Sequence, residues 1–504
     1  MKSVFKAVAT VTIFSIITRA LGFVFRVVLS RKLGAEGLGL FQMASSVLGI
    51  FVTIISSGLP VTTAKLVSNY ETANQLKHRN QVVSSSVLIS IILAIVCSAV
   101  VFLLKDLWSV ILADNRAVCI IIILIPSIIF SAVYSVFRGA LWGQNDYFNC
   151  GLTELIEQIV RIVLTVIFLM NINDYFVSCK LSAWAFDITC LISALLSAVI
   201  YLKKAKFDFK KGYYKSIIKS SAPITGVRLA SSLVQPLCSI LIPNLLLVYG
   251  FSKSEALACF GTIMGMTFPL LFIPMSIVGS ISMVLVPSIS SLAFKKDYST
   301  IKSNITRAFE VVIFVSMVFV PLFISVGNLM GIVLFNNLYS GVLLQLSAVC
   351  VIPICLCNLT GSILNALNLE AKSFKNYLFG SLILFAILLS LTPFIGINAV
   401  IIGEFVCMMT ISLLNFKKIK SVVPGLEFNL ISTISKYSVV ILPCSLLGHF
   451  VANICVAVFS NLFSAIIGGG IACLSMIILC KILKIFNPKD LLLLKRQKPK
   501  TENE

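Results

Sequence analysis

Residues 82–104 read VVSSSVLISIILAIVCSAVVFLL, an apolar run without a charged side chain. A helix needs about 20 mostly apolar residues to cross a bilayer, so this stretch predicts a membrane span. Similar runs fill the chain, because 59% of its 504 residues are hydrophobic and only 12% are charged, with a mean hydropathy of +1.04. A water-soluble protein of this length could not bury so much apolar surface. The sequence therefore predicts an all-α polytopic membrane protein with no sizeable soluble domain.

Charged residues, Gly, Pro and Asn divide the apolar runs into about fourteen predicted transmembrane helices. These cover residues 4–29, 39–64, 82–104, 117–141, 155–172, 181–202, 220–248, 258–292, 308–335, 341–366, 374–394, 396–416, 433–453 and 458–483. The least distinct boundary lies within 374–416, where only a turn at residues 393–398 separates two spans.

The chain carries 40 Lys and Arg against 19 Asp and Glu, a formal net charge of +21 at pH 7. On a soluble protein such an excess would suggest binding to nucleic acid. Here most basic residues fall in alternate loops and in both tails, which the positive-inside rule assigns to the cytoplasm. We therefore expect both termini to be cytoplasmic. Most of the charge then reflects topology and attraction to anionic lipid rather than a nucleic-acid partner.

The densest basic cluster follows the sixth span, near the middle of the chain. It divides the first twelve spans into two halves of six, which enter the membrane in the same orientation and predict a parallel pseudo-repeat with a central cavity. Similar stretches at 59–66 and 286–292, at the ends of the second and eighth spans, support the repeat. The predicted parts are an N-terminal six-helix lobe (1–203), a basic cytoplasmic linker (204–219), a C-terminal six-helix lobe (220–416), two additional helices (417–484) and a basic cytoplasmic tail (485–504).

Polar residues form a stripe along the first span of each half. They recur every three or four residues and so share one helix face. The stripes are Thr12, Ser15, Arg19, Gly22, Arg26 and Ser30 in the first span, and Ser221, Thr225, Arg228, Ser232, Gln235 and Ser239 in the seventh. Four arginines lie at membrane depth, and each costs about 2.5–3.5 kcal/mol at a helix centre, which implies a cavity or partners.

The first, second, seventh and eighth spans contain no Asp or Glu. One hypothesis is a water-filled, cationic cavity in which Arg19, Arg26, Arg228 and Gln235 bind an anionic substrate, since guanidinium groups suit phosphate. The alternative is structural: small polar residues pack the helices together, and Arg19 or Arg26 extends its charge to the membrane interface.

Acidic residues in other spans are candidates for gating or coupling. Glu157 and Arg161 stand at i and i+4, a spacing that predicts either a self-satisfied buried ion pair or a proton-linked switch. Asp187 and Glu404 are lone carboxylates within spans. They could bind a coupling ion such as a proton or sodium, or could be satisfied by snorkelling or hydrogen bonding.

Prolines concentrate in the seventh and eighth spans, where they predict kinks or broken turns that would permit bending. They are Pro223, Pro236 and Pro243 in the seventh span and Pro269, Pro274 and Pro287 in the eighth. The 15 cysteines lie mostly inside apolar runs and are interpreted as buried hydrophobic residues. The only histidines, His78 and His449, are far apart. We therefore expect no metal site and no cofactor, and no catalytic motif predicts an enzyme.

Several stretches of the first third resemble a known family. They are TRALGFVFR (residues 18–26), LGAEGLGLFQ (33–42), SGLP (57–60) with KLV (65–67), and FRG (137–139) with EQIVR (157–161). These runs are similar to the stage V sporulation protein B group. That group belongs to the oligosaccharide flippases of the multidrug/oligosaccharidyl-lipid/polysaccharide exporter superfamily, alongside the lipid II flippases. Where relatives usually have Pro and Ser before the Glu-Gln pair, this chain has CGLTE at 150–154.

The resemblance implies a bacterial cytoplasmic-membrane flippase with fourteen helices in two lobes. Its substrate would be a lipid-linked sugar carrying a diphosphate, such as a peptidoglycan or polysaccharide precursor, moved by alternating access. The family's cavity arginines correspond to Arg19 and Arg26, and less directly to Arg228. A role in spore cortex synthesis rests on the resemblance alone. The alternative is a cation-coupled multidrug exporter of the same fold, which would be expected to carry carboxylates in its central helices; a nontransporting membrane scaffold is a further alternative.

Overall fold

The computed structural model describes residues 2–112, 114–172, 174–209 and 212–485. Throughout these ranges the regular structure consists of helices, as the sequence predicts. An α-helix satisfies its backbone hydrogen bonds internally, which an apolar chain in lipid requires. The predicted basic tail, apart from its first residue, lies outside the described residues.

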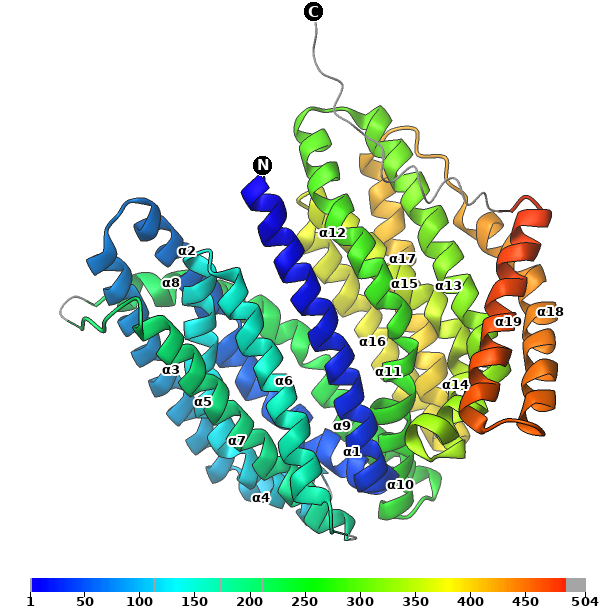
Figure 1. Cartoon of the computed structure of the whole chain (residues 1–504), viewed down its shortest axis with the longest axis horizontal. Helices are drawn as coiled ribbons and strands as arrows, with labels where there is room; N and C mark the ends of the chain where they lie inside the picture. The colour runs from blue at the N-terminus through cyan, green and yellow to red at the C-terminus, as the bar shows by residue number, and fades with distance from the viewer. Residues whose placement is uncertain (1, 113, 173, 210–211, 486–504) are drawn as a thin grey trace, which may run out of the picture. The chain divides into compact units, whose positions relative to one another are not determined.

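The chain forms two compact units, residues 1–265 and 266–504. The helices of the first unit carry blue to green colours in Figure 1. They are α1 (Lys2–Ser56), α2 (Gly58–Thr72), α3 (Leu76–Leu103), α4 (Lys105–Leu112), α5 (Asn115–Gly143), α6 (Tyr147–Leu169), α7 (Tyr175–Leu202), α8 (Tyr214–Ser232), α9 (Val234–Tyr249) and α10 (Lys253–Phe260). A π-helix, η1 (Gly261–Thr267), spans the boundary between the units.

The second unit continues from η1 to the last described helix. It contains α11 (Phe268–Leu271), α12 (Ile273–Phe294), α13 (Tyr298–Phe335), α14 (Leu338–Ser347), the 3₁₀ turn η2 (Ala348–Cys350), α15 (Val351–Ala366), α16 (Glu370–Ile395), α17 (Asn398–Val422), α18 (Leu430–Val456) and α19 (Asn461–Ile482). Helices α8 to α10 thus belong to the same compact unit as the helices before them. The predicted lobes were defined by span order and topology, and their limits remain a prediction.

Thirteen helices of the described chain are long and apolar enough to cross a membrane. One of them, Thr10–Thr72, has 63 residues and would be about 95 Å long if straight, so it accounts for two predicted spans. The predicted span 258–292 is represented by two of the thirteen, Lys253–Leu271 and Ile273–Phe294. The charged helix α6 stands outside that set, with 23 residues. Each predicted span therefore has a helical counterpart, and the chain is a multi-pass membrane protein.

Gly34 divides the long first helix. Its φ of 67° and ψ of −175° are not helical, and they lie in a region that residues with a Cβ atom rarely adopt. The break falls between the predicted spans 4–29 and 39–64. A second interruption at Ser57 separates α1 from α2, so the part of the chain after Gly34 is itself bent.

Two further helix breaks fall where the prolines cluster. Helices α8 and α9 meet at Leu233, three residues before Pro236, and α11 and α12 meet at Phe272, two residues before Pro274. A proline lacks the N–H that would continue the helical ladder, and its ring crowds the preceding turn. The predicted broken turns are therefore present in both spans.

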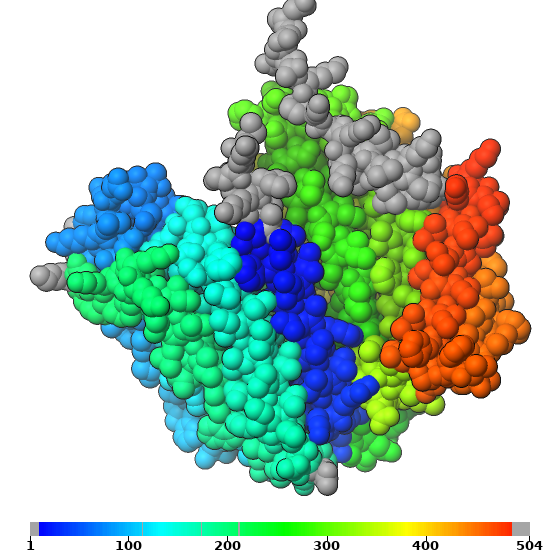
Figure 2. Space-filling view, in the orientation of Figure 1, coloured from blue at the N-terminus to red at the C-terminus, as the bar shows by residue number. Residues whose placement is uncertain are grey.

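The outer surface of the second unit is apolar where α18 and α19 form it. Val439, Leu442 and Phe450 are each more than 60% exposed, and Figure 2 shows these two helices along one side of the unit. In a membrane protein such side chains contact lipid rather than water. The 15 cysteines are all free and most are buried, which agrees with their interpretation as small hydrophobic residues.

Candidate functional site

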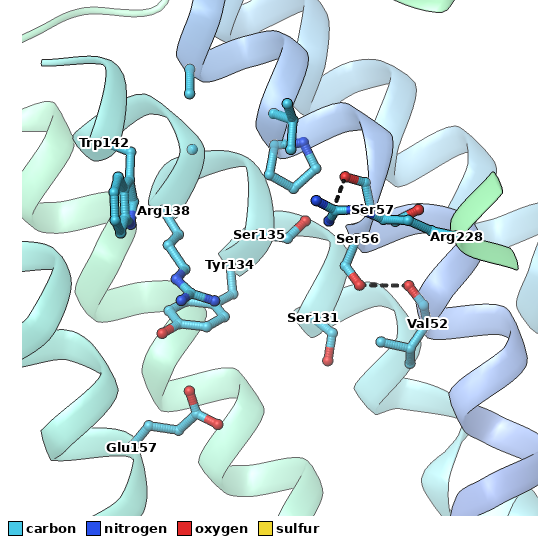
Figure 3. Close-up of a pocket in the computed structure, with 14 residues that line it drawn as sticks. Val52, Ser56, Ser57, Ser131, Tyr134, Ser135, Arg138, Trp142, Glu157 and Arg228 are labelled. Atoms are coloured by element: carbon cyan, nitrogen blue, oxygen red, sulfur yellow. Dashed lines mark hydrogen bonds between the residues drawn. The ribbon is translucent and has the colours of Figure 1, made fainter. Parts of the chain in front are cut away.

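A cavity of about 680 Å³ lies within the first unit, and Figure 3 shows the side chains around it. Five segments contribute to its wall: α1, α2, α5, α6 and α8. The lining residues are Val52, Ser56, Ser57, Pro60, Val61, Ala64, Ser131, Tyr134, Ser135, Arg138, Gly139, Trp142, Glu157 and Arg228. The volume falls in the range of small-molecule sites, about 300–1,000 Å³.

Helix α5 presents one face to the cavity. Its lining residues recur every three or four positions, which places serines, aromatic rings and an arginine on one side of the helix. Gly139 brings α5 close to α2, because a Cβ atom at this position would lie only 2.5 Å from the carbonyl oxygen of Pro60. The absence of a side chain at Gly139 therefore sets the distance between two walls of the cavity.

Arg138 is the cationic group of this face. It forms an ion pair with Glu154 of α6, and its side chain remains 44% exposed. Tyr134 stands one turn earlier and Trp142 one turn later on the same face of α5, and Figure 3 shows these three side chains around the cavity. An arginine oriented by a carboxylate can present its remaining N–H donors to an anion.

Glu157 lines the cavity and forms an ion pair with Arg161 on the same helix. The Arg161 guanidinium lies 4.9 Å from the ring centre of Phe186 on α7 and 6.0 Å from that of Phe25 on α1. The pair is mostly buried, with 17% and 13% side-chain exposure. The i, i+4 spacing of Glu157 and Arg161 predicts an ion pair, and the structure contains it. Two aromatic rings hold the arginine in place.

Arg228 reaches the cavity from α8. Its Nη1 donates a hydrogen bond of 3.3 Å to the carbonyl oxygen of Ser57, drawn as a dashed line in Figure 3. That carbonyl is accessible because Ser57 lies at the break between α1 and α2. A guanidinium group has five N–H donors, so this bond orients Arg228 and leaves others for a ligand.

The predicted site residues are distributed unequally. Arg228 and Glu157 line the cavity, whereas Arg19 and Arg26 of α1 and Gln235 of α9 are exposed outside its wall. Glu157 also brings a carboxylate to the wall of this cavity, where it is paired with Arg161. Helix α6, the counterpart of the fifth predicted span, contributes this carboxylate.

The remaining two candidates are buried carboxylates. Asp187 of α7 is 3% exposed; Ser127 of α5 lies beside it, but among the described residues neither of its oxygens has a hydrogen bond of normal geometry. Its neighbour Ser127 of α5 instead donates to the carbonyl oxygen of Leu124 at 2.6 Å. Glu404 of α17, in the second unit, is 9% exposed. Within the described residues no group of three or more His, Cys, Asp or Glu side chains could hold a metal ion.

Arg138, Tyr134 and Trp142 of the cavity wall were not among the predicted site residues. Arg138 lies close to the end of its predicted span, where a basic residue is readily attributed to topology. The signal that could have identified it is the polar and aromatic period of α5, together with the stretch 137–139 that carries the family resemblance.

Residues 4–293, more than half of the chain, match the family described as "Polysaccharide biosynthesis protein". Stage V sporulation protein B of Bacillus subtilis (strain 168) is 27% identical over 81% of this chain and 82% of its own length. The lipid II flippase MurJ of the same organism is 20% identical over 64% of this chain and 63% of its own length.

Solved structures share the fold. A lipid II flippase MurJ in an inward closed conformation has a TM-score of 0.72 at 13% identity, covering 94% of this chain and 99% of that structure. An inward-facing multidrug resistance MATE family transporter of the MOP superfamily has a TM-score of 0.69 at 16% identity, covering 84% of this chain and 99% of that structure. These similarities confirm the two-lobed pseudo-repeat fold class. The chain therefore belongs to the polysaccharide biosynthesis protein family.

Proposed function

We propose that this protein is a flippase that moves an anionic lipid-linked sugar across the bacterial cytoplasmic membrane by alternating access. The observation that carries the proposal is the cavity of about 680 Å³ lined by Arg138 and Arg228, two arginines from different helices. Family membership and a relative named as a lipid II flippase support the same class of cargo. In this proposal the lipid tail stays in the bilayer while the diphosphate enters the cavity.

The cavity offers two modes of binding to a diphosphate. Arg228 has N–H donors beyond the one directed at Ser57, so it can bind a phosphate without breaking a charged pair. Arg138 is already paired with Glu154, so a phosphate would share or displace that carboxylate. Bidentate guanidinium–phosphate bonds are strong and directional. The aromatic side chains of Tyr134 and Trp142 would then lie beside the sugar.

Arg19, Arg26 and Gln235 form a second, separate part of the proposal. The two arginines are exposed on α1 and lie on the polar stripe of that helix. We propose that they attract the anionic head group or bind it transiently before it enters the cavity. The double substitution Arg19→Ala/Arg26→Ala should then slow cargo movement while membrane insertion is retained. Full transport in this double variant would contradict a role for α1 in cargo binding.

Direction requires a source of energy. We propose that a proton or sodium ion bound at Asp187 or Glu404, or the membrane potential, biases the transport cycle. Each elementary charge moved across the membrane is worth about 2.3 kcal/mol per 100 mV. Asp187 suits a cation because it is buried and, among the described residues, both of its oxygens lack a partner. The Glu157–Arg161 pair remains a candidate gate.

The decisive experiment measures movement of a short-chain lipid-diphosphate sugar in proteoliposomes. Arg138→Ala/Arg228→Ala should reduce the rate by at least about 10-fold, since hydrogen bonds to charged groups are worth about 1.5–3 kcal/mol. Lys219→Ala is the matched control, because this exposed cationic residue also lies on α8 but does not line the cavity. Unchanged transport in the double variant, with the fold retained, would reject the proposed site.

The multidrug exporter is the second candidate, and Glu157 is the observation in its favour. A carboxylate in the cavity could bind a cationic drug, although Arg161 already neutralises this one. Efflux of an organic cation driven by a sodium or proton gradient, and lost in Glu157→Gln, would support the exporter. Movement of the sugar lipid without such efflux would support the flippase.

A role in spore cortex synthesis is the most specific part of the proposal. It rests on the similarity to a protein named for stage V of sporulation. Its test is complementation: the chain should restore cortex formation to a spore-former that lacks its stage V sporulation protein B. If the well-expressed wild-type chain fails to do so, the cortex role is rejected, and the proposed cargo would be the precursor of another polysaccharide.

A further inference from the structure

The described residues between α7 and α8, 203–209 and 212–213 and hereafter the linker, lie along the first turns of α3 and are hydrogen-bonded to it. The backbone N–H of Asp208 donates to Ser84 Oγ at 2.9 Å, and that of Tyr213 donates to Ser85 Oγ at 3.2 Å. These bonds hold two points of the described part of the linker against one helix. The linker therefore has a fixed position on the first unit rather than acting as a loose tether.

Side chains reinforce this attachment. Gln81 Nε2 donates to Asp208 Oδ2 at 3.0 Å, so the one acidic side chain of the linker is directed at α3. Lys204 forms an ion pair of 2.7 Å with Asp146, in the turn between α5 and α6. Arg79, which is buried and paired with Glu71, also donates to the carbonyl oxygen of Lys204 at 3.4 Å.

Two phenylalanines project from this fixed segment. Phe207 is 41% exposed and Phe209 is 56% exposed, and their rings stack with centres 5.7 Å apart and planes at 18°. Phe207 also packs at 6.2 Å against Phe137, a buried residue of α5. An aromatic pair held outward on an otherwise polar segment is typical of a surface that meets a partner or a membrane interface.

The position of the linker along α3 indicates that its exposed rings meet the membrane interface. Residues 81–87 of α3 are buried, and the first strongly exposed apolar side chain beyond them is Leu88, followed by Ile92. Ser84 and Leu88 are four residues apart, about 6 Å along a helix axis. The linker thus lies about one helical turn from the start of the lipid-facing part of α3, where aromatic side chains are enriched in membrane proteins.

The positive charge of the linker indicates which lipids it would attract. Lys203 and Lys206 are exposed on either side of the paired Lys204, and Lys215 and Lys219 follow on the first turns of α8. Asp208, the acidic residue of this segment, is turned toward α3. A cluster of lysines next to a membrane span attracts anionic lipid head groups electrostatically.

We propose that the linker is a binding surface for anionic phospholipid, with Phe207 and Phe209 inserted at the membrane interface and Lys203 and Lys206 on the lipid phosphates. This surface is separate from the cargo cavity, whose lining includes none of these residues, and it does not depend on the proposed transport function. Stacked rings provide the insertion, and the hydrogen bonds to α3 fix the depth. The linker would bind the leaflet toward which the basic loops face.

The test is photocrosslinking of the full-length protein in vesicles. A p-benzoylphenylalanine at position 209 replaces one aromatic side chain with another, and mass spectrometry identifies what it captures. In mostly neutral phospholipid containing a minor share of anionic phospholipid, we expect anionic adducts at least about threefold above their share. Lys203→Gln/Lys206→Gln should bring this ratio back to the share in the bilayer, whereas Lys203→Arg/Lys206→Arg should preserve it.

The same label at Leu88 is the control, because this apolar side chain is exposed on α3 one turn beyond the linker. It should capture neutral and anionic lipid in proportion to their amounts. Lipid adducts at position 88 but none at 209 would overturn the proposal, as would an equal anionic preference at both positions. Capture of a protein instead of lipid at 209, in native membranes, would assign the surface to a protein partner and overturn it as well.

Discussion

Helices α6 and α7 bury carboxylates in opposite ways. Glu157 of α6 has a partner one turn away, Arg161, whose guanidinium is further held between aromatic rings. Asp187 of α7 is more deeply buried, and among the described residues neither of its oxygens has a partner. The first carboxylate contributes to a neutral, self-contained pair. The second has no charged partner and no hydrogen bond of normal geometry among the described residues, so the two carboxylates should respond differently to substitution.

Removing Arg161 should produce the largest effect. Arg161→Ala leaves Glu157 as an uncompensated and mostly buried charge, which typically costs about 3–5 kcal/mol of stability. Chemical unfolding of the purified protein in detergent would measure this loss.

The swapped pair Glu157→Arg/Arg161→Glu separates structure from switching. If the pair is structural, the swap should recover most of the stability and transport that Arg161→Ala loses. If stability returns but transport does not, the orientation of the pair matters and the proton-linked gate gains support. Wild-type stability in Arg161→Ala alone would refute the contrast with Asp187.

Asp187 should respond with the opposite sign. Asp187→Val removes two buried oxygens that lack partners among the described residues, so we expect stability to be unchanged or higher by about 1–3 kcal/mol. Gradient-driven transport should be lost if this carboxylate binds the coupling ion. A strongly destabilised Asp187→Val protein would mean that the carboxylate makes an important structural interaction.

Glu404 provides the same comparison in the second unit. Glu404→Gln keeps the size of the side chain and removes its charge, so the change in stability should stay within about 1 kcal/mol. Dependence of transport on pH and on sodium, measured in both carboxylate variants, assigns the coupling ion. Loss of coupling in Glu404→Gln but not in Asp187→Val would place the coupling ion in the second unit.

The Lys204–Asp146 pair should have the smallest effect, because Lys204 is 55% exposed. Burial alone would raise the pKa of Asp146, but hydrogen bonds from Lys204 and Asn149 outweigh it and lower the pKa below its usual value. The stabilisation is therefore present above the ordinary carboxyl pKa of about 4 and is lost as the pH falls through the lowered value.

Lys204→Ala should cost about 0.2–1 kcal/mol at neutral pH. Its difference from the wild type should shrink at acid pH, where Asp146 becomes protonated in both proteins. Unfolding curves recorded at neutral pH and at a series of pH values below the ordinary carboxyl pKa of about 4 would measure this change. A difference that grows on acidification would contradict the assigned sign.

Local sequence patterns were sufficient for part of the site. The i, i+4 spacing of Glu157 and Arg161 predicts their ion pair, because residues four apart share a helix face. The polar stripe of the seventh span identifies Arg228, which lines the cavity. By contrast, Arg138 and its partner Glu154 come from different helices, and no spacing in the chain relates them.

The sequence by itself determined the membrane class, the approximate spans, the breaks near the prolines and the family. These depend on composition and on short-range rules of helix geometry, which apply wherever a segment lies in the fold. Only the tertiary structure decided that Arg138, Glu157 and Arg228 share a cavity while Arg19 and Arg26 lie outside it. It also decided that the linker is fixed to α3. Such contacts depend on how closely helices approach, and small residues such as Gly139 set that distance through packing across the fold.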